Sequence, residues 1–360
     1  MTDTDQIQPL SHSFLKSLVS RAINAPSGDN SQPWQFSVEE NSVTILNLPD
    51  ADETLYNFNQ RGSFFAHGAV IENISIIAET CGYNIDVSLF PSIPDAVATI
   101  TFIPTVVKKN LLEGFIEERS TNRRPYKKIS LREEDRRAIL QAIKDRPRIQ
   151  LRLVEERSVI NLLARTVSVN ERLLMENRAL HDFLFSMIRW DKKDEARAPG
   201  LYLKTMELPP PVQVLFRFVF RHWKAVLALN HIGLSHFIPI QSAPVYAASS
   251  AFAALVINGD KDEDFVAAGR SFQRLWLTAT AQGVYIQPVT AIPYLYQRIE
   301  EETVATFTPK HQELVREAYS IIAKEFQIQP TERIAMLFRL GYGDKPSAPS
   351  LKGRQIFKKF

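Results

Sequence analysis

Basic residues gather in one short segment whose spacing suits phosphate binding. The stretch ERSTNRRPYKK places Arg119 and Arg123, with further cations, within ten positions, and Ser120 and Thr121 lie between them. A guanidinium offers two parallel donors to a phosphate, and a neighbouring hydroxyl adds a third. A run of charge is equally typical of a solvated loop. The segment therefore predicts either an anion site or an exposed basic turn.

A second basic pair, Lys352 and Arg354, lies in SLKGRQIFKKF near the end of the sequence. A frayed, solvated tail is the plain interpretation of such a segment. The same two cations could instead reach an anion bound elsewhere in the chain. The sequence leaves both interpretations open.

The stretch NAPSGDNSQPWQF, residues 24–36, combines turn-forming residues with a Trp. Pro, Ser, Gly, Asp and Asn each favour turns for a different reason, so an ordinary surface turn is one interpretation. A loop that holds a polar ring system is the other, because Gly28 allows the backbone to approach a ligand closely.

Other routes to chemistry are missing from the sequence. It contains no Walker loop, GxGxxG, GxSxG elbow, paired Cys or HExxH motif. His222, His231 and His236 share one helical region, but no carboxylate stands at ligand spacing beside them. Packing histidines are therefore favoured over a metal site. No catalytic acid or base is identified, so a bound organic cofactor would carry any reaction.

The elements that must position these residues are helices and strands in mixed order. Helical spacing predicts a helix over 13–24, and alternation predicts a hairpin around 39–41. A long helix is expected to end near Gly82 and to lead into a strand, with another strand over 96–104. After residue 109 the sequence predicts a helix over 110–119, an N-capped helix from Ser130 and a strand in IQLRLVEE. A mostly helical region over 158–240 follows. The sequence then predicts a strand within 242–259 and a helix and strand around Gly283.

Two of these helices resemble each other. AVIENISIIAETCGYNI and SFQRLWLTATAQGVYIQ share an apolar rhythm, a Gly stop and a following strand. An internal duplication explains this similarity, and two unrelated helices with Gly C-caps are the alternative. The sequence thus predicts an α+β fold with halves at 1–108 and 109–360, the second half containing a helical insertion at 158–240.

Composition sets broad limits on function. The 360 residues are 45% hydrophobic and 23% charged, with a net charge of +3. These values are typical of a soluble globular protein and argue against nucleic-acid binding. The single cysteine excludes a disulfide framework within one chain and fits a reducing, cytoplasmic compartment. We expect Cys81 to be a buried small hydrophobe. The polar N-terminus predicts no signal peptide, and basic residues interrupt the most apolar segment, 212–234, too often for a membrane span.

Together the motifs resemble the nitroreductase superfamily of FMN-dependent oxidoreductases. APSGDNSQPW, residues 25–34, looks like that family's Pro-Ser-x-x-Asn-x-Gln-Pro-Trp loop, and RSTNR, residues 119–123, looks like its phosphate motif. KGR, residues 352–354, resembles its C-terminal phosphate-binding pair. AAGRSFQRLWLTATAQGVYIQP resembles its core helix and the strand that faces the flavin.

The order of the motifs departs from that of ordinary members. There the phosphate arginines precede the Pro-Ser loop, whereas here they follow it by about ninety residues. Family members are usually homodimers that build each flavin site from both subunits. The resemblance therefore implies two degenerate copies fused as a pseudo-dimer with one retained site, similar to the longer Acg-type nitroreductase-like proteins.

The resemblance also implies roles for individual residues. It assigns Arg119, Thr121, Arg123, Lys352 and Arg354 to the FMN phosphate. It places Pro26, Ser27, Gly28 and Asn30 along the ring and ribityl portion of FMN, and the backbone of Gln287 and Pro288 near the ring. Gln32 and Trp34 are expected to fix the shape of the loop instead.

Three functions follow as hypotheses. The first is ping-pong hydride transfer from NADH or NADPH to an electron-poor acceptor such as a quinone or nitroaromatic, in a monomer or homodimer. The second is flavin binding or storage without turnover, with Phe216, Phe218, Phe220 and Trp223 lying over the flavin as a lid. The third makes the same segment a membrane-surface or partner-binding face, because it mixes Arg with Phe.

Overall fold

The first half of the chain is a sheet with two helices. The structure, a computed structural model, describes residues 10–146, 148–197, 199–301, 305–353 and 357. The first half contains α1 (His12–Ala22), β1 (Trp34–Glu39), β2 (Ser42–Asn47), α2 (Arg61–Thr80), β3 (Tyr83–Leu89) and β4 (Ala96–Pro104). Its four strands pair antiparallel in the order β1-β2-β4-β3. This is the element order that the hydrophobic pattern predicts.

The second half repeats this plan with additions. It contains α3 (Glu133–Gln141), β5 (Ile149–Val154), β8 (Ala251–Asn258), α11 (Asp262–Ala281), β9 (Tyr285–Pro288), α12 (Ala291–Glu301), α13 (Pro309–Glu325) and β10 (Glu332–Gly341). The strands again form a four-stranded antiparallel sheet, in the order β5-β8-β10-β9. Helices packed on antiparallel sheets confirm the predicted α+β class.

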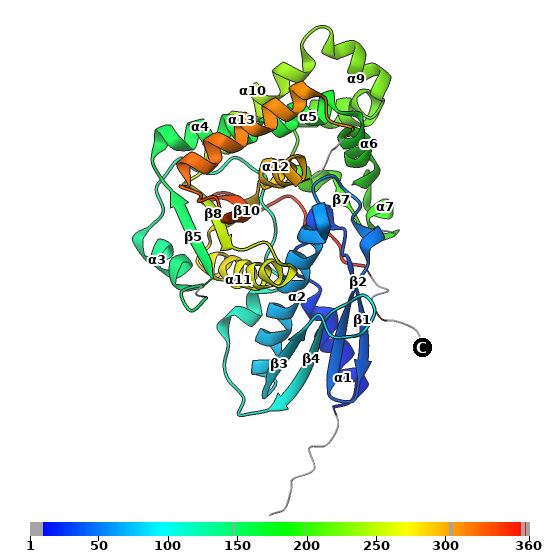
Figure 1. Cartoon of the computed structure of the whole chain (residues 1–360), viewed down its shortest axis with the longest axis vertical. Coiled ribbons are helices and arrows are strands. Elements are labelled where there is room, and N and C mark those ends of the chain that lie inside the picture. The colour runs from blue at the N-terminus through cyan, green and yellow to red at the C-terminus, as the bar shows by residue number, and fades with distance from the viewer. Residues whose placement is uncertain (1–9, 147, 198, 302–304, 354–356, 358–360) are drawn as a thin grey trace, which may run out of the picture.

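A long helical region separates β5 from β8, as the sequence predicts. It consists of α4 (Arg157–Val167), α5 (Val169–Glu176), α6 (Arg178–Met187), β6 (Ile188–Arg189), α7 (Lys192–Arg197), β7 (Leu201–Tyr202), α8 (Pro210–Leu215), α9 (Trp223–Asn230) and α10 (Leu234–Ala247). Figure 1 shows α5, α6, α9 and α10 at the end of the molecule opposite to β3 and β4.

Three local predictions were wrong. Residues 110–119 hold only a 3-10 turn, Leu111–Phe115, because Asn110 caps a single turn and no longer helix follows. Ser130 does not cap a helix, since the chain stays extended to Arg132 and α3 begins after it. The text after Ser242 continues α10 up to Ala247, despite its two prolines, and the strand begins only at Ala251.

Cys81 is exposed, which corrects the expectation of a buried small hydrophobe. It occupies the C-cap of α2, and Gly82 follows with a positive φ of 85°. The chain therefore turns out of the helix at this point, which leaves the thiol at the surface.

Helices α2 and α11 cross at reciprocal glycines. A Cβ at Gly68 would lie 2.0 Å from the carbonyl oxygen of Val266, and a Cβ at Gly269 would lie 1.9 Å from that of Phe65. Both helices have 20 residues, and the glycine is the eighth residue in each. The contact is therefore self-complementary in the way that a two-fold subunit interface is.

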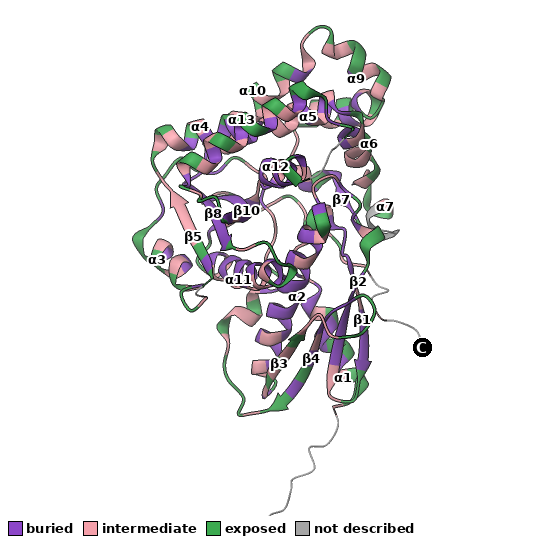
Figure 2. Cartoon of the chain, viewed as in Figure 1, coloured by how far each residue is buried: buried purple, intermediate pink, exposed green. Residues whose placement is uncertain are grey.

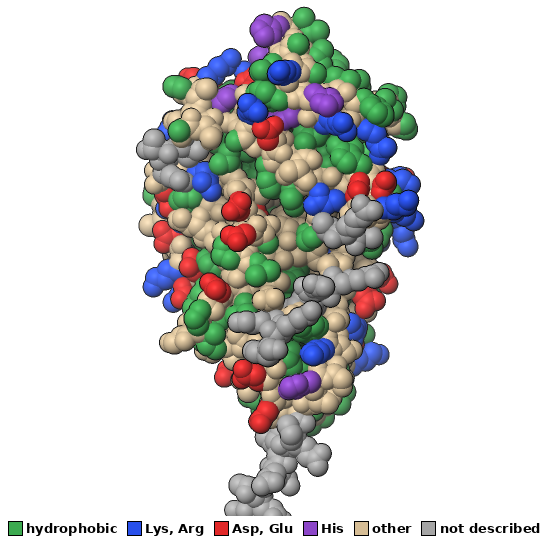
Figure 3. All heavy atoms as spheres, turned by 90° about the vertical axis from the view of Figure 1, so that its right-hand side faces the viewer, with side chains coloured by type: hydrophobic (Ala, Val, Ile, Leu, Met, Phe, Trp, Pro, Cys, Tyr) green, Lys and Arg blue, Asp and Glu red, His purple; other side chains and the backbone are tan. Residues whose placement is uncertain are grey.

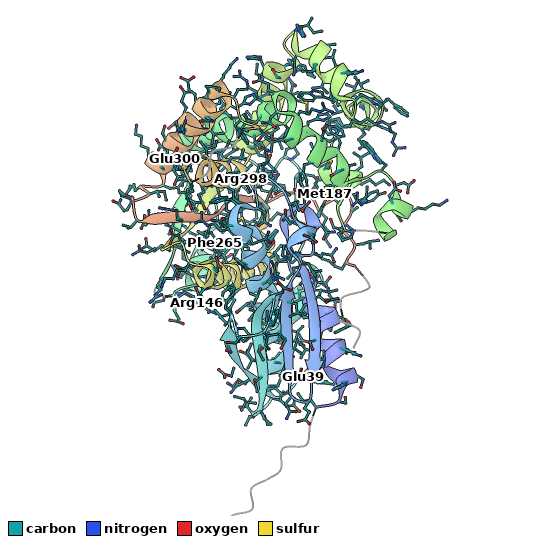
Figure 4. The ribbon with its side chains drawn as sticks, turned by 45° about the vertical axis from the view of Figure 1, so that its right-hand side comes forward. Glu39, Arg146, Met187, Phe265, Arg298 and Glu300 are labelled. Carbon is teal, nitrogen blue, oxygen red and sulfur yellow. The ribbon has the colours of Figure 1, made fainter. Side chains whose placement is uncertain are left out.

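Buried charge reinforces the crossing. Glu72 of α2 is fully buried, and its carboxylate accepts hydrogen bonds from Arg270 and Arg274 of α11 and from Arg146. Phe265, labelled on α11 in Figure 4, lies 5.3 Å from the Arg61 guanidinium of α2. Figure 2 shows both helices largely in the colour of buried residues. The crossing thus forms the centre of the molecule.

Candidate functional site

The loop between α1 and β1 has a well-defined, strained backbone. Asp29, Asn30 and Gln32 all have positive φ, at 45°, 59° and 52°. The Ser27 hydroxyl accepts a hydrogen bond from the Gln32 backbone N–H at 3.0 Å and so closes the turn. Non-glycine residues rarely adopt this conformation, and such strain gathers at functional sites.

The C-terminal segment lies against this loop. The Asn30 amide donates to the carbonyl oxygens of Gly200 and Leu351, and its Oδ1 accepts from Lys352 Nζ at 3.0 Å. The Gly353 N–H donates to Gln32 Oε1 at 2.6 Å. The Asn30 amide is thus fully engaged by protein groups. Gln32 fixes the loop against the C-terminal segment, in keeping with the structural role expected for it.

Arg119 approaches the loop from the second half. Its Nη2 donates to the Asn24 carbonyl at 2.8 Å, and its guanidinium stacks on Trp276 of α11 at 4.5 Å. Its Nε is buried and has no hydrogen-bond partner among the described residues. Burial lowers the pKa of Arg119 to about 10. One donor of this guanidinium is therefore left for a ligand.

Lys352 lies beside Arg119. Its ammonium donates to the Ala25 carbonyl at 2.9 Å as well as to Asn30. Burial, followed by the charge of Arg119, lowers the pKa of Lys352 to about 7. Within the described residues neither cation has a carboxylate at ion-pair distance. Two uncompensated, partly desolvated cations form a site suited to an anion.

Both side chains keep some accessible surface, although burial dominates their pKa shifts. A side chain can be surrounded by protein and still touch solvent when it lines a hollow, which accounts for both observations. The same combination holds for Arg123, Asp29 and Tyr246. Charge interactions link Lys352 with Arg119, and Arg123 with Asp29 and Tyr246, and we call the region of these two groups the recess.

Arg123 occupies a different part of this recess. Its Nη1 donates to the Thr205 carbonyl at 3.1 Å, burial lowers its pKa, and the charge of Asp29 opposes that shift. Thr121 forms a backbone bridge to Ile286, beside β9. The structure therefore joins Arg119 with Lys352 and places Arg123 near Asp29. Arg354, the remaining predicted phosphate ligand, lies outside the described residues.

Gln287 and Pro288 lie in β9, the edge strand that pairs with β10. Gln287 Oε1 accepts from Arg339 Nε at 2.7 Å, and Pro288 pairs with Phe338 in the ladder. Arg339 is fully buried and also donates to the Arg124 carbonyl at 2.7 Å. The side-chain oxygen of Gln287 is therefore engaged by Arg339.

Sequence reasoning missed Arg339. Its guanidinium lies 4.0 Å from the Tyr126 ring and fixes the basic loop against β10. One signal was available, since a single Arg interrupts the apolar strand IAMLFRLGY. A charged residue in a strand that is otherwise buried rarely occurs without partners.

Carboxyl groups near the recess were also missed. Burial raises the pKa of Asp52 to about 6 and that of Glu171 to about 7. The Tyr246 hydroxyl donates a hydrogen bond to Glu171. Burial raises the pKa of Tyr56, and the charges of Asp29 and Glu171 raise it further. Such groups can hold a proton near neutral pH and release it to a reacting molecule.

The aromatic residues assigned to a lid lie elsewhere. Phe216 and Phe220 are buried in the core of the helical insertion, Trp223 packs on His181, and Phe218 is 65% exposed. The segment Gly200–Glu207 of the insertion contacts Asn30 of the loop at 24–36 and also the basic residues Arg123 and Arg124. Among the described residues no group of His, Cys, Asp and Glu is arranged to hold a metal ion. The described helices include none that is long and apolar enough to cross a membrane.

The chain is similar in sequence to two proteins of Mycobacterium tuberculosis. No known family profile matches the chain. It is 27% identical over 288 residues to an uncharacterized protein, MT1398, of Mycobacterium tuberculosis, covering 77% of this chain and 38% of that protein. It is 33% identical over 94 residues to the putative NAD(P)H nitroreductase acg of the same organism, covering 25% of this chain and 28% of that one. The chain thus spans well under half the length of these curated relatives.

Several solved structures are similar at low sequence identity. A Bacteroides fragilis nitroreductase with bound FMN has a TM-score of 0.36 at 10% identity and covers 68% of this chain and 95% of its own. The FMN-dependent nitroreductase NfnB of Mycobacterium smegmatis, in complex with NADPH, has a TM-score of 0.34 at 15% identity and covers 64% of this chain and 87% of its own.

Proposed function

We propose that the chain binds one FMN and acts as an oxidoreductase of the nitroreductase type. The observation that carries the proposal is the pair Arg119 and Lys352, which lies beside the Pro-Ser-Asn loop without a carboxylate partner in the described residues. FMN would supply hydride exchange between a reduced nicotinamide nucleotide and an electron-poor acceptor such as a quinone or nitroaromatic.

The residues of the site fit this cofactor. Arg119, with its unpartnered buried Nε, and Lys352 would hold the phosphate. Trp276 supports the Arg119 guanidinium from below, so the arginine is oriented before a ligand arrives. Pro26, Ser27 and Gly28 retain accessible surface and would lie along the ring system.

The two halves contribute complementary parts. The loop comes from the first half, and Arg119 and Lys352 come from the second. The reciprocal crossing at Gly68 and Gly269 supports the interpretation that the halves are degenerate copies fused as a pseudo-dimer. The domain boundary between 108 and 109 is part of this proposal. One cofactor per chain follows from it.

Flavin content and reduction test the proposal. We expect the purified, FMN-reconstituted protein to carry one FMN per chain and to lose its flavin absorbance when NADH or NADPH is added without oxygen. Two FMN per chain would contradict the single composite site, and no FMN would contradict the cofactor. Bound FMN that neither nucleotide reduces would contradict the oxidoreductase.

A covered, non-turnover flavin site is the second candidate, and the segment Gly200–Glu207 favours it. The backbone carbonyls of Gly200 and Thr205 accept hydrogen bonds from Asn30 and Arg123. The Glu207 carboxylate forms an ion pair with Arg124. The Glu207 carboxylate also accepts from the backbone and hydroxyl of Ser347. The insertion is thus fastened over the recess at several points. Slow dithionite reduction together with no nucleotide reduction would distinguish this function from the first.

A further inference from the structure

The tip of the helical insertion has an unusual surface. Helices α8, α9 and α10 and the π-helical turn Phe216–Phe220 bury one side in a shared core around Phe216, Phe220 and Val226. A helix on a protein surface normally turns its polar side outward. Here the outward side also exposes large apolar side chains, so this region differs from the rest of the surface.

Seven of the fifteen large hydrophobic residues that are exposed in the described chain fall within residues 214–240. We call them the apolar tip: Val214, Leu215, Phe218, Leu227, Ile232, Phe237 and Ile240. Ile232, in the turn between α9 and α10, is 82% exposed, and Phe218 is 65% exposed. Val214 and Phe218 are four residues apart and Phe237 and Ile240 three apart, so each pair shares one side of its helix.

The segment that carries the apolar tip is basic, although Glu176 from α5 binds Ser235 beside it. From Leu208 to Gly259 the sequence contains no Asp or Glu, while it contains Arg217, Arg221 and Lys224. Arg221 and Lys224 are exposed, as are His222, His231 and His236. Figure 3 shows hydrophobic side chains at the top of this face, interspersed with Lys, Arg and His. An exposed apolar surface with an excess of positive charge attracts anionic lipid headgroups.

We propose that the apolar tip docks the protein on an anionic lipid bilayer. Phe218, Ile232 and their neighbours would enter the headgroup and acyl boundary, and Arg221 and Lys224 would contact lipid phosphates. The most exposed residue lies in a protruding turn at the end of the molecule, a shape that enters a soft interface more readily than it fits a rigid partner (Figure 1). The proposal is independent of whether the flavin turns over.

Flotation with vesicles tests it on the full chain. We expect the protein to float with vesicles of phosphatidylcholine and phosphatidylglycerol at a 7:3 ratio, at least tenfold more than with pure phosphatidylcholine, and to detach as salt is raised. The double variant Phe218→Ser, Ile232→Ser should lose at least tenfold in partitioning. The matched control Val106→Ser, Leu111→Ser changes two exposed hydrophobic residues on another loop and should float like the unchanged protein.

Two results would overturn the proposal. One is no flotation with anionic vesicles at low salt. The other is flotation that the Phe218→Ser, Ile232→Ser variant retains although it unfolds at the same temperature as the unchanged protein. Sedimentation tests whether a second copy of the chain binds the apolar tip instead. If the unchanged protein is a dimer and the Phe218→Ser, Ile232→Ser variant is a monomer, the partner of the tip is a second chain and not a bilayer.

Discussion

The charge of Arg119 lowers the pKa of Lys352, and both side chains donate to backbone carbonyls of the loop that follows α1. Arg119 follows the first sheet and Lys352 lies in the C-terminal segment, so the fold has brought two like charges together against electrostatic repulsion. A bound anion would offset this repulsion, because it attracts both cations.

Lys352→Met should weaken FMN binding strongly and change the stability of the apo-protein little. The variant removes one charge-assisted contact of about 1.5–3 kcal/mol, which corresponds to roughly a 10- to 150-fold rise in Kd. It removes the repulsion with Arg119 but also the hydrogen bonds to Ala25 and Asn30, and because these effects oppose each other the melting temperature of the apo-protein should change little. Fluorescence titration and calorimetry measure the two effects. Lys345→Met, at an exposed lysine, is the control and should change neither.

FMN affinity should fall as pH rises above 7. Lys352 has a pKa of about 7 in the apo-protein, and a bound phosphate favours its charged form, so binding takes up a proton above that pH. The affinity should drop up to about tenfold per pH unit. Titrations between pH 6.5 and 9 measure this slope, which Lys352→Met should flatten. An equally steep slope in the variant would assign the proton to another group.

Apo-protein stability should rise over part of this range. The pKa of Lys352 lies below that of an unfolded lysine, about 10.4, so the unfolded chain holds more protons between these two values. The contribution of Lys352 to the free energy of unfolding therefore increases from pH 7 towards pH 10. Urea unfolding of the unchanged protein and of Lys352→Met would isolate it by difference.

Gly269→Ala should destabilise the chain by about 1–3 kcal/mol or more. The added Cβ would meet the backbone carbonyl of Phe65, which cannot move without separating α2 from α11. Urea unfolding measures the loss. Gly114→Ala is the matched control, because nothing lies within 4 Å of a Cβ at that position. Equal stability of the two variants would show that the helices can part at little cost.

His67 should make the protein sensitive to acid. It is fully buried in α2, and burial lowers its pKa to about 3. The unfolded chain therefore binds one more proton between about pH 6.5 and 3, and His67 reduces stability by about 1.4 kcal/mol for each pH unit below 6.5. Unfolding at several pH values should show this slope, and His67→Leu should lack it. The exposed His12→Gln is the control and should retain the slope.

Glu207→Ala should loosen the cover over the recess. Its carboxylate holds Arg124 on one side and Ser347 on the other, so the variant frees the segment from both. In FMN-loaded protein, iodide should quench the flavin fluorescence several-fold more strongly than in the unchanged chain. The exposed Glu313→Ala serves for comparison. Unchanged quenching would mean that other contacts keep the segment closed.

Regular periodicity explains which elements could be predicted. The residues of β4 and the C-terminal end of α2 follow from sequence because apolar spacing and a Gly stop are local signals. The end of α10 does not, since tertiary packing keeps Ser242–Ala247 helical although Pro244 and apolar text favour a break. Local propensity is overridden there by contacts distant in sequence.

The site shows the same division. The loop at 24–36 and Arg119 were found because their residue types recur at fixed spacing. The proximity of Arg119 to Lys352 could be expected only from the resemblance, and the separate environment of Arg123 depends on Asp29 and Thr205. Arg339 and Glu171 belong to no local motif, and only the packed structure shows that Arg339 binds the Arg124 carbonyl and that Glu171 binds Tyr246.

Dilution should not separate α2 from α11, which cross through Gly68 and Gly269 within one chain. In an assembly of two separate chains such an interface comes apart when the concentration falls below its dissociation constant. Here both helices belong to one polypeptide, and the covalent connection keeps their effective concentration high whatever the number of molecules in solution. The Kd for FMN should therefore be the same at nanomolar and at micromolar protein.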